Sequence, residues 1–119
     1  MTKSLKYILV IVLIINFCHL VYSQEKTGVN RLISSLEHSN RDTNRVILLI
    51  DIADGLIRNT PDDAKKYASE AIHLAEKLKF KRGIAEGYIM LGSVHYQTSD
   101  FKMAADCFEI CLPTFHINI

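Results

Sequence analysis

His95, Cys107 and Cys111 are the residues of this sequence whose types and spacing could do chemistry. Cysteines four residues apart lie on one face of a helix, and thiolate and imidazole ligands together favour zinc. A fourth ligand is not evident, and a buried free cysteine behaves as a small hydrophobe. Helical spacing also disfavours an unstrained disulfide between the two cysteines. We therefore expect the three residues to pack in a core, with metal binding and redox chemistry as the alternatives.

Catalytic motifs are missing from the sequence. It contains no nucleophile motif, no glycine-rich phosphate loop and no HExxH zinc motif. The adjacent Asp62 and Asp63 are typical of the first turn of a helix, where negative charge suits the helix dipole. We expect a protein that is not an enzyme and that has no catalytic, cofactor-binding or metal-binding residues.

Residues 1–23 have the layout of a secretory signal peptide. Lys3 and Lys6 form a basic start, an apolar run follows from Tyr7 to Ile15, and a short tail ends at Ser23. This apolar run is shorter than the roughly 20 residues needed to cross a bilayer. A cleaved signal peptide is the prediction, with an uncleaved N-terminal anchor or a buried helix as alternatives. The protein is then exported, to a bacterial periplasm or the medium, or else tethered to the membrane.

The charge of the remaining chain argues against nucleic acid as a partner. Cleavage would remove Lys3 and Lys6 from the 14 basic residues and leave 12 of them against 13 acidic ones. That balance gives no basic surface for a phosphate backbone. Only Cys107 and Cys111 would remain after cleavage, too few for the disulfide framework of a small secreted domain.

Apolar residues at helical spacing run through nearly the whole chain and predict an all-α fold. A short helix is expected from Gly28 to His38. A second should begin at Asp42 or Thr43 and end at Asn59, and a third should start at Pro61. Further helices are expected over 84–97 and 101–112, the last capped by Ser99 or Asp100. The expected buried positions of the second and third helices are Val46, Leu49, Ile50, Ala53, Leu56 and Ile57, then Ala64, Tyr67, Ala68, Ala71, Ile72, Ala75 and Leu78.

Four basic residues, Lys77, Lys79, Lys81 and Arg82, gather where the third helix should end. Cations are favourable near exposed carbonyls at a helix C-terminus, and Gly83 would serve as the exit. We interpret this run as a solvated helix end and not as a binding patch.

An internal repeat links the two halves of the helical region. Ala64 and Ala104, and likewise Ala71 and Cys111, are 40 residues apart. The second copy contains Tyr88-x-x-Leu91-Gly92-x-x-His95, followed by Ala104 and Phe108. This pattern resembles a tetratricopeptide repeat, which has an aromatic residue, Leu-Gly and a second aromatic on its first helix, then Ala, aromatic, Ala on its second.

The resemblance is closer over 85–112 than over 45–78, where Ile52-Ala53 replace Leu-Gly and Ala68 replaces the aromatic residue. The 40-residue period exceeds the usual 34. The resemblance implies antiparallel helix pairs stacked as an α-solenoid of about two repeats. The expected segments are a signal peptide (1–23), a leader with a short helix (24–41), two repeats (42–82 and 83–112) and an irregular tail (113–119). The residues expected to pack the repeats are Ala53, Ala64, Ala71, Tyr88, Leu91, Gly92, Ala104, Phe108 and Cys111.

Tetratricopeptide proteins usually bind a ligand along the concave surface made by the first helix of each pair. Carried over to this sequence, that surface would consist of Ile47, Ile50, Asp54, Ile57 and Arg58 in the first copy and of Glu86, Ile89, Ser93, Tyr96 and Gln97 in the second. The basic and asparagine residues with which some family members clamp a terminal carboxylate are absent. An extended peptide or a partner helix is therefore the expected ligand. For Ile50, Ile57 and Ile89, packing against a neighbouring helix is an equal alternative.

Two repeats leave an apolar end uncovered, whereas stacked-helix proteins need about three. We expect a fragment, a truncated product, or a protomer that buries this end by self-association. Two functions follow from the resemblance. One is an exported module that binds a protein or peptide, and the other is the truncated sensory region of a membrane-bound bacterial histidine kinase or transcriptional regulator.

Overall fold

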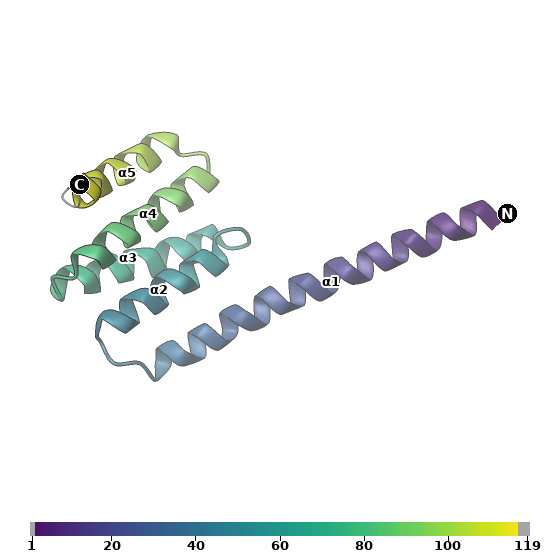
Figure 1. Ribbon diagram of the computed structural model, residues 1–119, viewed down its shortest axis with the longest axis horizontal. Coiled ribbons are helices and arrows are strands. Elements are labelled where there is room, and N and C mark those ends of the chain that lie inside the picture. Colours follow the sequence, from purple (N-terminus) through teal and green to yellow (C-terminus); the bar gives the residue numbers. More distant parts are fainter. Residues whose placement is uncertain (1, 117–119) are drawn as a thin grey trace.

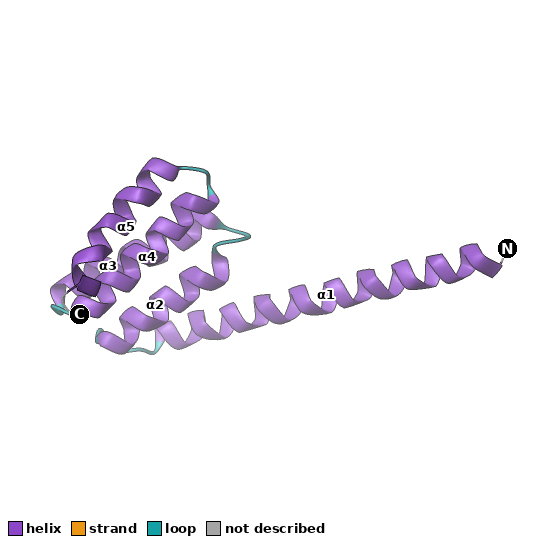
Figure 2. Ribbon diagram, turned by 45° about the horizontal axis from the view of Figure 1, so that its top comes forward, coloured by secondary structure: helices purple, strands orange, loops and turns teal. Residues whose placement is uncertain are grey.

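The protein is built from helices joined by short turns (Figures 1 and 2). The computed structural model describes residues 2–116, and it describes their side chains except those of residues 25, 26 and 114–116. No strand occurs among residues 2–116, so the expected all-α class is confirmed. The helices are α1 (Thr2–Glu37), α2 (Thr43–Leu56), α3 (Pro61–Lys77), α4 (Lys81–Gln97) and α5 (Phe101–His116).

Each helix packs against the next along the chain, and α2 also contacts α4. Helices α2 to α5 form a bundle in which successive helices are antiparallel, while the N-terminal half of α1 projects away from it (Figure 1). The antiparallel arrangement follows from the connections, because turns of three or four residues can only reverse the chain.

Helix α1 is one uninterrupted helix of 36 residues. The sequence analysis predicted a separate short helix from Gly28 to His38. This start is wrong, because the helix runs through Ser23 and Gly28 without a break. The only helix-disfavouring residue in this stretch is Gly28, whose cost of about 1 kcal/mol is too small to end a helix. The length and apolar composition of α1 fit either a signal sequence or a membrane anchor.

The C-terminal part of α1 covers one side of α2. Val29 lies against Gly55, where an added Cβ would come within 2.5 Å of the Val29 side chain. Leu36, the next-to-last residue of α1, is buried. Arg45 of α2 then donates from Nη1 to the carbonyl oxygen of Leu36 (2.8 Å) and to Ser39 Oγ (2.9 Å). Apolar contact and this capping interaction together fix α1 on α2.

The core lies between α2, α3 and α4. Val46, Leu49 and Ile52 are the largest fully buried side chains of the described residues, all from α2. From α3 they meet a row of small residues with no exposed surface: Ala64, Ala68, Ala71 and Ala75. This confirms the predicted apolar faces of the two helices. Leu74, which the sequence analysis left out, is also buried, whereas Leu78 is 38% exposed.

Asp42 and Asp100 cap the starts of α2 and α5 with their side chains, as the sequence predicts. The Asp42 carboxylate accepts a hydrogen bond from the backbone N–H of Arg45 (3.2 Å) at the start of α2. Asp100 does the same for Met103 (3.3 Å) at the start of α5. Each satisfies an N–H that has no partner within the helix. Helix α3 begins with Pro61, and the side chain of Thr60 makes no capping hydrogen bond.

The turn between α3 and α4 differs from the expectation. Lys79 adopts the left-handed conformation (φ 54°), and the N–H of Phe80 bonds to the carbonyl of Ala75 (2.9 Å) while that of Lys79 bonds to Glu76 (3.1 Å). These two hydrogen bonds define a Schellman ending. Lys79, and not Gly83, is therefore the exit residue of α3.

Helix α4 starts at Lys81, so Lys81 and Arg82 belong to its first turn and not to the end of α3. Arg82 pairs with Glu86 one turn later (2.8 Å). Gly83 lies inside α4, where an added Cβ would come within 3.0 Å of the side chains of Phe80 and Val46. Its lack of a side chain serves packing and not helix termination.

Helix α5 continues through Pro113 to His116, where an irregular tail was expected. Proline removes one backbone hydrogen bond, to the carbonyl of Glu109, and this loss falls close to the end of the helix. The rest of the expected tail, 117–119, lies outside the described residues.

Small residues let the helices of the bundle approach closely. A Cβ on Gly87 would lie 2.6 Å from Ile72 Cγ1, and one on Gly92 would lie 2.7 Å from Phe108 Cε1. Gly92 thus faces α5, as the repeat pattern predicts, although Phe108 itself remains 39% exposed. The other expected packing residues are buried (Ala53, Ala64, Ala71, Ala104 and Cys111) or half-buried (Tyr88 and Leu91).

The substitution Gly87→Ala should destabilise the protein. The new methyl group would force α3 and α4 apart at buried Ile72, and overpacking costs about 1–3 kcal/mol against a helix-propensity gain of about 1 kcal/mol. We expect the free energy of unfolding to fall by about 1 kcal/mol in chemical denaturation of the full chain in detergent micelles.

Gly28→Ala is the matched control, because nothing lies within 4 Å of a Cβ at this helical position. It should leave stability unchanged or raise it. Equal effects of the two substitutions would contradict close packing at Gly87.

Candidate partner-binding surface

The outer sides of α2 and α4 carry most of the residues that the tetratricopeptide resemblance suggested for partner binding. Asp54, Arg58, Tyr96 and Gln97 are exposed, and Glu86, Ile89 and Ser93 are half-buried. Ile47 of α2 is 41% exposed. We call this surface the open face of α2 and α4, defined by Ile47, Asp51, Asp54, Arg58, Glu86, Ile89, Ser93, Tyr96 and Gln97.

Two isoleucines of the original set are packing residues. Ile50 is only 9% exposed and belongs to the core shared with Leu36 and Leu74, so the packing alternative holds for it. Ile57 is half-buried and packs against the cluster that contains Ala53 and Val94. The cause is that α3 and α1 wrap around more of α2 than a repeat pattern alone indicates.

Asp51 is the residue of this face that the sequence analysis missed. Burial raises the pKa of its carboxyl above the ordinary 3.8, and the like charges of Asp54 and Glu86 raise it further. Glu86 belongs to α4, so the open sides of the two helices lie close enough for these charges to interact. The i, i+3 spacing of Asp51 and Asp54 on one helix was a usable signal, whereas the proximity of Glu86 depends on tertiary packing.

A groove separates the open face from α1. It has a volume of about 430 Å³, and Asp54, Ile57 and Arg58 line it from α2 and the following turn. Gly28, Val29 and Leu32 line it from α1. The part of the open face that α2 contributes therefore lies across this groove from α1.

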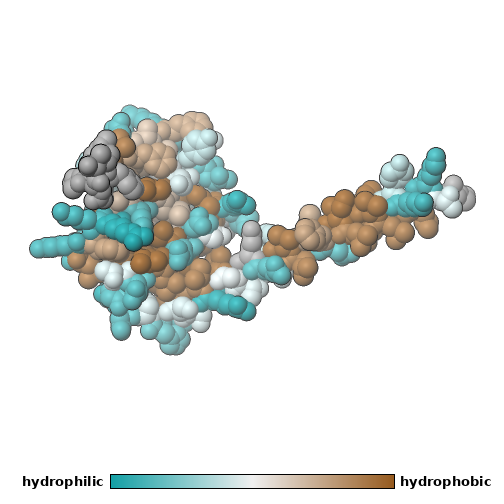
Figure 3. Space-filling view, in the orientation of Figure 1, coloured by the Kyte–Doolittle hydropathy of each residue, from teal (hydrophilic) through white to brown (hydrophobic). Residues whose placement is uncertain are grey.

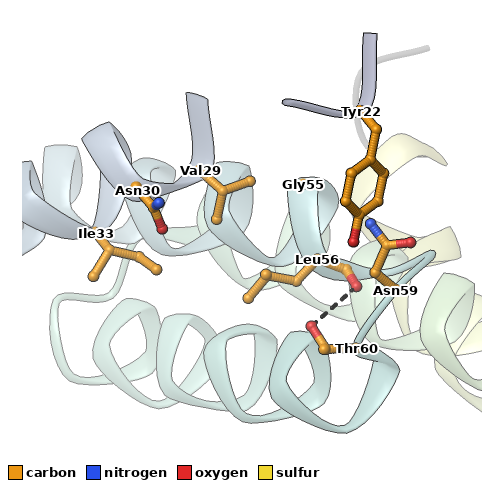
Figure 4. A pocket seen from close by; sticks show the side chains of 8 residues that line it. All are labelled: Tyr22, Val29, Asn30, Ile33, Gly55, Leu56, Asn59 and Thr60. Carbon is orange, nitrogen blue, oxygen red and sulfur yellow. Dashed lines mark hydrogen bonds between the residues drawn. The ribbon is translucent and has the colours of Figure 1, made fainter. Parts of the chain in front are cut away.

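A second hollow, of about 280 Å³, lies on the other side of the Val29–Gly55 contact (Figure 4). Val29 and Ile33 project into it from α1, and Leu56 projects from α2. Tyr22 and Asn59 lie together at one end of this hollow, and Thr60 Oγ1 donates to the carbonyl oxygen of Leu56 (3.5 Å). The lining is mixed, with few convergent polar groups, so nothing in it indicates a specific small-molecule ligand.

His95, Cys107 and Cys111 are buried, as expected for packing residues. His95 Nδ1 lies 3.7 Å from Asp100 Oδ2 across the α4–α5 turn. The Cys111 thiol lies 3.3 Å from the carbonyl oxygen of Ala85 on α4 and 3.2 Å from that of Cys107. Within residues 2–116, no three or more His, Cys, Asp or Glu side chains are arranged to hold a metal ion.

Helix α5 exposes large apolar side chains among polar ones such as Lys102, Asp106 and Glu109. The exposed large apolar side chains are Phe101 (58%), Met103 (44%), Phe108 (39%), Ile110 (51%) and Leu112 (51%). In the first copy, Ile72 occupies the position equivalent to Leu112 and is buried beneath α4.

Comparisons with family models, with curated proteins and with solved structures find no match to this chain.

Replacing Asp51 with asparagine should change the pH dependence of stability. The folded-state pKa of Asp51 is raised, so the folded state binds this proton more tightly than the unfolded state. Stability then falls as the pH rises from about 3.8 through the raised pKa. We expect Asp51→Asn to raise the midpoint of thermal unfolding slightly at neutral pH and to have no such effect at a pH well below 3.8. Asp106→Asn, at an exposed position of α5, should not raise the unfolding midpoint at neutral pH in this way.

The two buried thiols should react slowly. Burial raises the pKa of both Cys107 and Cys111, and the charge of Asp106 adds to the effect on Cys107. Because the thiolate is the nucleophile, we expect iodoacetamide at about pH 8 to modify them far more slowly in the folded protein than in concentrated guanidinium. Peptide mass spectrometry over time would measure this, and equal rates in the two states would contradict the buried placement.

Proposed function

We propose that this protein is a non-catalytic interaction module of the tetratricopeptide type that binds a protein or peptide. The proposal rests on the repeat pattern together with the helix contacts. Successive helices pack as antiparallel neighbours, and α2 and α4, the first helices of the two copies, also contact each other. That arrangement is expected of two stacked pairs in an α-solenoid.

The binding surface in this proposal is the open face of α2 and α4. The observation that supports it most is the raised pKa of Asp51, which comes first from burial and then from the like charges of Asp54 and Glu86, the latter already paired with Arg82. A bound cation would relieve the repulsion among these carboxylates, and exposed Ile47, one helical turn from Asp51 on α2, offers apolar contact beside it. The partner segment should therefore carry both basic and apolar side chains, as an extended peptide or as one side of a helix.

The second candidate function is the sensory region of a membrane-bound bacterial signalling protein. The observation in its favour is α1, a single helix long and apolar enough to cross a membrane and joined directly to the bundle. Either function places the bundle on the exported side of a membrane, in the periplasm or outside the cell. The exposed apolar side chains of α5 are available in both cases for association with a second chain.

A labelled peptide tests the proposed binding surface. The probe is a fluorescein-labelled peptide of alternating lysine and valine, titrated with the full chain in neutral detergent micelles and followed by fluorescence anisotropy. We expect saturable binding that weakens at high salt. The double substitution Asp51→Asn with Asp54→Asn should weaken it about three- to tenfold, since exposed ion pairs contribute about 0.2–1 kcal/mol each.

Asp106→Asn with Glu109→Gln is the matched control, because it removes the same charge from exposed residues of α5. This variant should bind as the parent does. Equal losses in the two double variants, or equal binding of a glutamate–valine peptide, would contradict the proposed surface.

A further inference from the structure

The direction of the chain places two turns of the bundle at the same end. Helix α2 runs back along α1, so the α2–α3 turn lies beside the middle of α1, where Asn59 and Thr60 share a hollow with Tyr22. The α4–α5 turn lies at this end as well, on the side toward which the N-terminal half of α1 extends (Figures 1 and 2). We call this end, formed by residues 57–60 and 98–100, the turn end.

The projecting half of α1 is a continuous helix long and apolar enough to cross a membrane, although Asn16 and His19 follow its uninterrupted apolar run from Tyr7 to Ile15. From Leu5 to Tyr22 its large apolar side chains are all 43% exposed or more, and the side of this segment seen in Figure 3 is largely apolar. Eighteen helical residues are about 27 Å long, close to the hydrocarbon thickness of a bilayer. Lys3 and Lys6 lie at its outer end, as expected for the cytoplasmic side of a span.

An exposed aromatic pair flanks the α4–α5 turn. Tyr96 is 63% exposed and Phe101 is 58% exposed, and their rings make an edge-to-face contact with centroids 5.4 Å apart. Tyr22, at the end of the apolar segment of α1, is 55% exposed. Aromatic residues are enriched where proteins meet the headgroup region of a bilayer, because an apolar ring and a polar edge suit that environment.

The link between α1 and the bundle is stiff. The helix is continuous through Ser23, whose carbonyl oxygen accepts a hydrogen bond from Thr27 Oγ1 (2.8 Å). The Val29–Gly55 contact and the Arg45 hydrogen bonds to Leu36 and Ser39 then fix the bundle to the helix. A bilayer around α1 would therefore meet one particular side of the bundle, the turn end.

We propose that the turn end is a membrane-contact surface and that its partner is a phospholipid bilayer. Helix α1 stays attached and crosses the membrane over residues 5–22, and Tyr96 and Phe101 lie in the headgroup region. This inference goes beyond peptide binding and does not depend on it. The open face of α2 and α4 would then stand beside the membrane, so its partner would be bound close to the bilayer surface.

Tryptophan fluorescence tests the orientation, since the chain contains no tryptophan of its own. The variant Phe101→Trp is reconstituted as the full chain in phosphatidylcholine nanodiscs that contain lipids brominated near the headgroup. We expect its emission to be blue-shifted and strongly quenched. Tyr96→Trp serves as a second reporter if Phe101→Trp does not fold, and circular dichroism checks the helix content of each variant.

Arg41→Trp is the control reporter, because Arg41 is exposed in the turn between α1 and α2, at the opposite end of the bundle. Its emission should not be quenched. Three results would overturn the proposal: no quenching at either turn-end position, equal quenching of the Arg41→Trp variant, or loss of residues 1–23 from the parent chain on expression in a bacterial host, detected by intact mass. The first two results leave the proposed peptide binding untouched.

Discussion

The close approach of α3 and α4 is the packing constraint on which the bundle depends. At Gly87 the two helices come so near that Ile72 occupies the space of a missing side chain. The alanines of α3, all without exposed surface, allow α2 to approach the same helix from its other side. Helices this close exclude water from the few large side chains between them, chiefly Leu49 and Ile52. That contact also positions α4 beside α2 and so creates their common open face.

Much of this packing could be predicted from the sequence, because small residues at helical spacing leave a clear pattern. The alanine row of α3, the close contact at Gly92 and the capping roles of Asp42 and Asp100 all follow from residue type and position. The helix boundaries were mispredicted where one local signal was weaker than another. Gly83 looked like a helix end, but the chain turned at Lys79 because the two Schellman hydrogen bonds stabilise the left-handed conformation there.

The candidate surface was harder to predict than the core. A repeat pattern identifies which side of a helix is outermost, yet it does not show how far neighbouring helices reach around that side, and Ile50 proved to be buried for this reason. Asp51 was missed because its importance depends on Glu86, which is 35 residues away along the sequence and on another helix. Likewise, nothing local in the sequence placed the aromatic pair of Tyr96 and Phe101 at the end of the bundle nearest to the apolar part of α1.

The proposed binding surface depends on Asp51 and Asp54 of α2 lying close to Glu86 of α4. Carboxyl carbon NMR titration of Asp51, in the parent chain and in Glu86→Gln, tests this most directly. The account predicts a pKa above 3.8 in the parent chain, which falls when the charge of Glu86 is removed. An Asp51 pKa that is unchanged by Glu86→Gln would show that the two helices do not share this surface and would contradict the account.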